Sequence, residues 1–283
     1  MSHVPSELAE KLSKRQLILF VGAGVSMSLT LPSYGALIRE IGDHVGFDGE
    51  IFQGLGDYLT LAEYYHLKKK GLKDLQAYLR REWERDDKDI LESQVHRAIV
   101  ELDCDLIYTT NFDSFLERAH RGMNRPPQTI RSAKDLVNLK LDRPQIVKFH
   151  GDLTIPSAMV FTETSFFERL SFESPLDLKL RADALGKSLL FIGYSLSDIN
   201  MRYLMFRLQR QWESESEPEL RPKSYVFMGR PNAVQSTVLA SRGVETIDAE
   251  SKDPAESLAA FLRALRSAAD ELESESSAVQ KKK

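Results

Sequence analysis

The stretch Leu17-Ile18-Leu19-Phe20-Val21-Gly22-Ala23-Gly24-Val25-Ser26 decides the fold class of this chain. Its first five residues are all apolar, as in a parallel strand that is covered on both faces. Gly22 and Gly24 then let the backbone approach a phosphate without a Cβ in the way, although a tight turn leaving the sheet is the alternative. Met27 breaks the G-x-G-x-x-G fingerprint, and the segment has no P-loop lysine.

The same apolar pattern recurs further along the chain and defines the expected sheet. It is found at residues 105–109, 145–149, 188–192 and 224–228, and more weakly at 244–247. Helical patterns separate most of these runs, which predicts an α/β fold with a doubly wound parallel sheet. We expect one domain over residues 1–275, with a helical insertion at about 50–102 and a disordered charged tail at 276–283.

Composition excludes several functional classes. The chain has 283 residues, 42% of them hydrophobic, and can bury a large core. A net charge of −4 makes direct nucleic-acid binding unexpected. The single cysteine, Cys104, rules out an intrachain disulfide and a cysteine-rich zinc site, and we expect no metal. Neither a signal peptide nor an apolar run of the ~20 residues that span a bilayer is seen, which favours a cytoplasmic protein without a membrane partner.

Three further polar segments follow strand ends, as Gly22 does. They are Thr109-Thr110-Asn111-Phe112-Asp113, His150-Gly151-Asp152 and Gly193-Tyr194-Ser195-Leu196-Ser197-Asp198. Open α/β sheets bind ligands at the carboxyl ends of their strands, so we expect one composite site for a nucleotide cofactor. For each segment alone, helix capping or a structural hydrogen bond is the alternative reading.

Two of these residues carry chemistry that suits a ribose. The amide of Asn111 offers donors and an acceptor without charge, so it can orient a ribose hydroxyl or a water molecule. The imidazole of His150 can accept a proton near neutral pH. Ser195 could add a hydrogen bond to a ribose or a phosphate.

In order and spacing, the four segments resemble the sirtuin-type NAD-binding fold: Gly-Ala-Gly-x-Ser, Thr-x-Asn-x-Asp, His-Gly and a Gly-x-Ser strand end. Leu31-Pro32-Ser33-Tyr34 adds a resemblance to the bacterial sirtuin-like branch that is linked to antiphage defence. The resemblance spans about residues 16 to 210. Sirtuin deacylases carry a four-cysteine zinc module that this chain cannot supply, so the resemblance implies NAD hydrolysis rather than deacylation.

The resemblance also implies roles for individual residues. NAD is the implied substrate, and its cleavage to nicotinamide and ADP-ribose would deplete the cell of NAD during phage infection. Asn111 and His150 are the implied catalytic residues. The implied cofactor-binding residues hold the pyrophosphate, the nicotinamide side and the adenosine half; they are Gly22, Ala23, Gly24, Ser26, Thr110, Asp113, Gly193 and Ser195.

Partners are implied by the same resemblance. A homo-oligomer is expected, with a HerA-like hexameric ATPase as a possible partner. Two other functions stay open at this point: a module that binds NAD or ADP-ribose without cleaving it, and a sirtuin-type deacylase or ADP-ribosyltransferase. A nuclease subunit is disfavoured, because neither the charge nor a metal-ligand cluster supports it.

Overall fold

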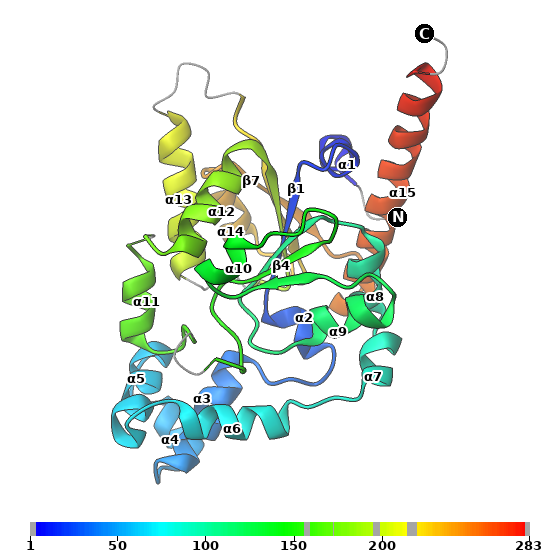
Figure 1. The fold of residues 1–283 in the computed structure, drawn as a ribbon. Coiled ribbons are helices and arrows are strands. Elements are labelled where there is room, and N and C mark those ends of the chain that lie inside the picture. Colours follow the sequence, from blue (N-terminus) through cyan, green and yellow to red (C-terminus); the bar gives the residue numbers. More distant parts are fainter. Residues whose placement is uncertain (1–3, 156–158, 172, 195–198, 214–219, 281–283) are drawn as a thin grey trace.

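A seven-stranded parallel sheet forms the centre of the protein (Figure 1). The computed structural model describes residues 4–155, 159–171, 173–194, 199–213 and 220–280. The strand order is β3-β4-β2-β1-β5-β6-β7, which confirms the predicted α/β fold with a doubly wound parallel sheet. The strands are β1 (Leu17–Val21), β2 (Leu106–Thr109), β3 (Gln128–Ile130), β4 (Gln145–Lys148), β5 (Ser188–Ile192), β6 (Ser224–Met228) and β7 (Val244–Asp248).

Alternate side chains of the central strand β1 enter two separate cores. Leu17, Leu19 and Val21 pack on one face of the sheet, whereas Ile18 and Phe20 pack on the other. Helices contribute to the first core from α1 (Ser6–Ser13), α8 (Gln94–Glu101), α9 (Phe115–Gly122) and α15 (Pro254–Gln280). The second core takes in α12 (Pro175–Gly186), α13 (Ile199–Glu213) and α14 (Ala233–Ala240), with α10 (Ala133–Val137) at its edge. Both faces are therefore covered, which explains the unbroken apolar run of β1.

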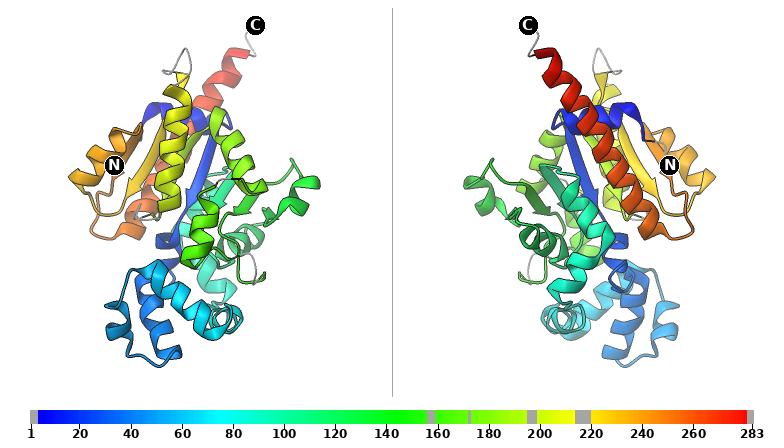
Figure 2. Two further views of the ribbon diagram at one scale, coloured as in Figure 1. Left: turned by 90° about the vertical axis from the view of Figure 1, so that its left-hand side faces the viewer. Right: turned by 90° about the vertical axis from the view of Figure 1, so that its right-hand side faces the viewer.

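A helical module lies beyond the carboxyl ends of the strands (Figure 2). It consists of α3 (Tyr34–His44), α4 (Gly49–Gln53), α5 (Tyr58–Lys69) and α6 (Lys73–Glu82), which enclose their own apolar core. Leu153, Met159 and Phe161 from the chain after β4 complete that core, and α11 (Glu163–Arg169) contacts α5.

The boundaries of this module differ from the predicted insertion at about 50–102. It takes in α3, because the apolar stripe of α3 faces the module and not the sheet. It excludes α8, because Val95, Ile99 and Leu102 pack on the sheet. A short helix, α7 (Asp87–Glu92), leads from the module to α8. The sequence shows that a helix has an apolar face, but it does not show on which core that face packs.

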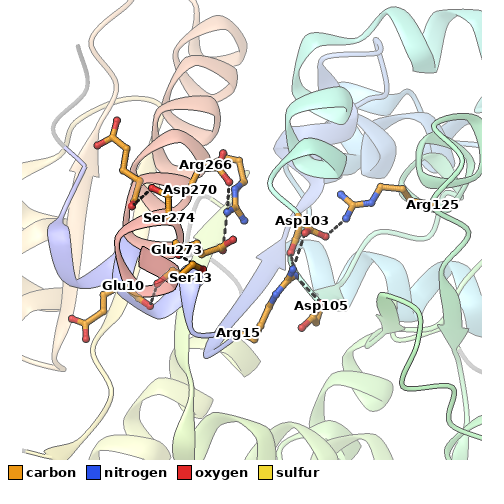
Figure 3. A network of polar contacts seen from close by, with 12 residues as sticks. Glu10, Ser13, Arg15, Asp103, Asp105, Arg125, Arg266, Asp270, Glu273 and Ser274 are labelled. Atoms are coloured by element: carbon orange, nitrogen blue, oxygen red, sulfur yellow. Dashed lines mark hydrogen bonds and ion pairs between the residues drawn. The ribbon is translucent and has the colours of Figure 1, made fainter. Parts of the chain in front are cut away.

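The C-terminal helix also differs from the prediction of a tail that is disordered from residue 276. Helix α15 continues to Gln280, and residues 281–283 lie outside the described part of the chain. Its later turns are tied to the body of the helix, since Arg266 pairs with Asp270 and, at 2.8 Å, with Glu273 (Figure 3). Leu272 packs at the edge of the first core, and the helix continues for about two further turns beyond this last large apolar contact.

Ion pairs join the turns at the amino ends of β1 and β2, opposite the helical module. Arg15 reaches Asp103 at 2.9 Å and Asp105 at 3.0 Å, and Arg125 also pairs with Asp103 (Figure 3). Hydrogen bonding to Asp103 raises the pKa of Arg15 above its ordinary value. In the described ranges, none of the helices is both long and apolar enough to cross a membrane.

Candidate functional site

The described parts of the four predicted segments meet at the carboxyl end of the sheet. Val21 is in register with Thr109 on one side and with Ile192 on the other, and Thr109 is in register with Lys148. The carboxyl ends of β4, β2, β1 and β5 are therefore level and adjacent. The strand order reverses between β1 and β5, because β2, β4 and β3 lie on one side of β1, whereas β5, β6 and β7 lie on the other. Such a switch point is where open α/β sheets bind ligands.

Asn111 is held in one orientation by its neighbours. Its main-chain NH donates to Thr109 Oγ1 at 3.0 Å. Its side-chain Nδ2 donates to the carbonyl oxygen of Gly22 at 3.1 Å and to Ser26 Oγ at 3.0 Å. A main-chain carbonyl can only accept, so this contact fixes which end of the amide is the nitrogen. Both hydrogens of Nδ2 are thereby used.

The other end of this amide has no partner. The Oδ1 atom of Asn111 is buried and accepts no hydrogen bond from the described residues, and the residue is only 7% exposed. A buried acceptor without a donor costs about 1–3 kcal/mol, which a ligand hydroxyl or a water molecule can recover. The geometry therefore presents an oriented hydrogen-bond acceptor to whatever occupies the site.

Ser26 and Asp113 continue the same hydrogen-bond chain. Ser26 Oγ donates to Asp113 Oδ2 at 2.7 Å, and both side chains are buried. The second oxygen of Asp113 accepts from the NH of Phe115 at 3.0 Å, at the start of α9. In the structure both residues support Asn111, while their expected contacts with the pyrophosphate and the nicotinamide stay predictions.

The glycines allow the ends of β1 and β5 to touch. Gly24 donates its NH to the carbonyl of Gly193 at 2.9 Å. A Cβ on Gly22 would lie 2.7 Å from that carbonyl oxygen and 2.8 Å from the ring of Tyr194, and Gly193 itself has a φ of +68°. Ala23 and Gly24 are exposed at the start of the short helix α2 (Ala23–Met27), so they remain accessible to a ligand.

Tyr194 links the two sides of the switch point. Its hydroxyl lies 2.8 Å from Thr110 Oγ1 and donates to the carbonyl of Val21 at 3.4 Å. The predicted site residue Ser195 lies outside the described residues. No role for Tyr194 was predicted from the sequence, although an aromatic residue directly after a strand-ending glycine is a visible signal.

His150 lies in an aromatic environment at the end of β4. It is 3% exposed, and its ring stacks on Phe149 with a centroid distance of 5.7 Å and meets the edge of Phe166 at 5.4 Å. Burial, together with the nearby charge of Arg169, lowers the pKa of His150 to about 3. The imidazole is therefore neutral near pH 7.

Arg169 supplies the nearby positive charge at His150, and no pattern in the sequence points to it. Its guanidinium lies 4.1 Å from the centre of the Phe149 ring and pairs with Asp177 at 2.7 Å. Asp152, next to His150 in the sequence, is buried and pairs with Arg131 at the end of β3. No group of three or more histidine, cysteine or acidic residues is arranged to hold a metal within the part of the chain that the structure describes.

Comparisons with known proteins identify relatives of this arrangement. A family model described as SIR2-like domain matches residues 105–247, about half of the chain. The chain is 27% identical over 212 residues to a protein of Bacillus cereus (strain MSX-D12) named NAD(+) hydrolase ThsA, covering 74% of this chain and 43% of that protein. A protein of the same name from Enterococcus faecium is 28% identical over 200 residues, covering 70% and 41%. Defense-associated sirtuin 2 of Bacillus subtilis is 22% identical over 252 residues, covering 87% and 24%. The chain thus spans less than half the length of these relatives.

Proposed function

We propose, from the premise that this chain belongs to the SIR2-like domain family, that it is an NAD hydrolase. It would cleave the bond between nicotinamide and ribose to give nicotinamide and ADP-ribose. The observation that carries the proposal is the buried, oriented and unpartnered Oδ1 of Asn111 at the switch point of the sheet. Relatives named NAD(+) hydrolase ThsA support the choice of substrate and reaction.

NAD would lie across the carboxyl ends of the four central strands. The pyrophosphate would lie against the segment from Gly22 to Gly24, where Ala23 and Gly24 are accessible. Ser26, Thr110 and Gly193 follow the ends of the same strands, and Ser195 would serve the adenosine half. Asp113 would lie on the nicotinamide side, next to the proposed reaction centre.

Asn111 would act on the ribose through its acceptor oxygen. The bond from the ribose C1′ to nicotinamide breaks with its electron pair going to the cationic pyridinium ring, which becomes neutral. The leaving group therefore needs no strong general acid, unlike that of most glycosidases. Oδ1 would accept a hydrogen bond from a ribose hydroxyl or from the attacking water, in a site from which bulk solvent is excluded.

His150 would take the proton that the attacking water loses. Water bonding to an oxocarbenium-like C1′ becomes strongly acidic as the C–O bond forms. A weak base is then sufficient, and the lowered pKa of His150 makes it a weak base that is fully neutral at working pH. The proton would pass to His150 late in the reaction and then to solvent.

A role in antiphage defence follows from the names of the relatives, which include a defence-associated sirtuin. NAD depletion is harmful to the cell, so the enzyme would need control. Assembly into a homo-oligomer, or with a hexameric ATPase of the HerA type, would supply it in the cytoplasm. No membrane partner and no direct nucleic-acid contact are part of this proposal.

The test is product analysis. The purified chain is incubated with NAD, alone and with the products of neighbouring genes, and nicotinamide and ADP-ribose are quantified. We expect equal amounts of both products, and a loss of about 10²–10⁴-fold in the variants Asn111→Ala and His150→Ala. Binding of ADP-ribose without release of nicotinamide under any condition would instead favour a binding module. Transfer of ADP-ribose to an acyl peptide or a protein would favour a sirtuin-type transferase or deacylase.

A further inference from the structure

Lys148 is a charged residue inside the apolar sheet. It is the last residue of β4, next to Val147 and Phe149, and its side chain is only 1% exposed. Its ammonium group donates a hydrogen bond to the main-chain carbonyl of Asp113. It also lies 3.5 Å from Glu117 Oε1 on α9, and Glu117 is itself 2% exposed.

Net stabilisation is a weak explanation for this pair. The carboxylate oxygens of Glu117 make no hydrogen bond to other described residues, so Lys148 is the counter-charge that the structure shows for them. Buried ion pairs lose much of their attraction to desolvation, and apolar residues of similar size are often at least as stabilising. We therefore ask which part of the structure the pair holds in place.

Its place in the chain suggests an answer. Asp113 follows Asn111 by two residues, and Lys148 precedes His150 by two residues. Residues 110–114 between β2 and α9 form neither helix nor strand. The bond from Lys148 to the Asp113 carbonyl thus joins this irregular loop to the end of β4, two residues before His150.

We propose that Lys148 is a positioning residue, which sets the loop that carries Asn111 against the strand end that carries His150. Glu117 lies beside the ammonium group and holds it directed at the loop. This inference rests on the proposed NAD hydrolysis for its catalytic consequence, but the tie between loop and strand can be tested without substrate.

The test uses a double variant. Lys148→Met alone would leave Glu117 as a buried charge without a partner, and the protein could fail to fold. Lys148→Met/Glu117→Leu removes both charges, and we expect it to melt within a few degrees of the wild type. Without the bond to Asp113, kcat for NAD cleavage should fall about 10–100-fold, while KM changes less than about threefold, because loosened geometry affects the chemical step more than binding.

A second measurement follows the loop directly. Amide hydrogen exchange of residues 110–116 should be faster in the double variant, with exchange in β1 and β5 unchanged. The matched control is Lys179→Met, which removes a lysine paired with Asp183 at 2.8 Å on α12 and should change neither kcat nor the loop.

The outcomes separate the two proposals. A folded double variant with wild-type kcat, or with unchanged exchange of residues 110–116, would overturn the positioning role. A loss of kcat that parallels a loss of melting temperature in the double variant would also overturn the positioning role. That result would indicate an effect on stability alone. If the wild type cleaves no NAD, the proposed function fails, and the exchange measurement still decides whether Lys148 holds the loop.

Discussion

Replacing Ser26 by alanine removes the link between Asn111 and Asp113 and should reduce both stability and activity. The hydroxyl donates to Asp113 Oδ2 at 2.7 Å and accepts from Asn111 Nδ2 at 3.0 Å. A bond to a charged group contributes about 1.5–3 kcal/mol and a neutral one about 1 kcal/mol, and the variant leaves buried Asp113 Oδ2 and one hydrogen of Asn111 Nδ2 without these partners. We expect the free energy of unfolding to fall by about 2–3 kcal/mol.

The catalytic effect of Ser26→Ala follows from the freed amide. Nδ2 keeps the Gly22 carbonyl but loses its second acceptor, so the amide is held by one bond and the position of Oδ1 is less restrained. Misplacement on the scale of 1 Å lowers rates by up to about 100-fold, and we expect kcat to fall about 10–100-fold. Urea unfolding and nicotinamide release measure the two effects.

Ser28→Ala is the matched control for this prediction. Ser28 lies near Ser26 in the chain, and its hydroxyl donates to the Val25 carbonyl at 2.6 Å. Its loss should cost about 1 kcal/mol or less and leave kcat unchanged. If the Ser26 and Ser28 variants behave alike in both assays, the chain from Asn111 through Ser26 to Asp113 does not orient the amide.

Three further predictions concern the glycine contact and the buried histidines. Gly22→Ala should lower the unfolding free energy by about 1–3 kcal/mol, because the new Cβ would lie 2.7 Å from the Gly193 carbonyl; wild-type urea unfolding would contradict this. The profile of kcat/KM against pH should show no histidine step near pH 6.5, because burial holds the pKa of His150 at about 3; a step there that is absent in His150→Gln would refute it. His96 has a pKa lowered by burial to about 4, so the folded state is favoured above pH 6.5 and loses stability as pH falls from there toward 4. In His96→Gln, the stability lost between pH 7 and pH 5 should therefore be smaller by about 2 kcal/mol, and an unchanged loss in urea titrations would contradict the burial argument.

Much of the sheet could be predicted from sequence, because the central strands are mostly apolar. The run from Leu17 to Val21 and the run from Ser188 to Ile192 are buried throughout, and both appear as predicted. Strand β3 could not be predicted, since its three residues include Gln128 and Thr129 and only Ile130 is buried. Its pairing with β4 depends on the tertiary structure and not on a local pattern.

The meeting of the four polar segments could also be predicted, because parallel strands end at the same edge. The functions of single side chains within the site could not. The resemblance implies that Asp113 contacts the ligand, and the structure adds that both of its oxygens accept hydrogen bonds from protein groups. Lys148 is visible as a lone charge in an apolar strand, but its partner Glu117 lies on a helix whose packing the sequence does not specify.

The most direct measurement is a crystal structure of the His150→Ala variant with NAD bound, in which cleavage is slowed. The account predicts that the nicotinamide ribose lies within hydrogen-bond distance of Asn111 Oδ1, beside the place vacated by the imidazole. A dinucleotide bound at another edge of the sheet, or with its adenosine half at Asn111, would contradict it.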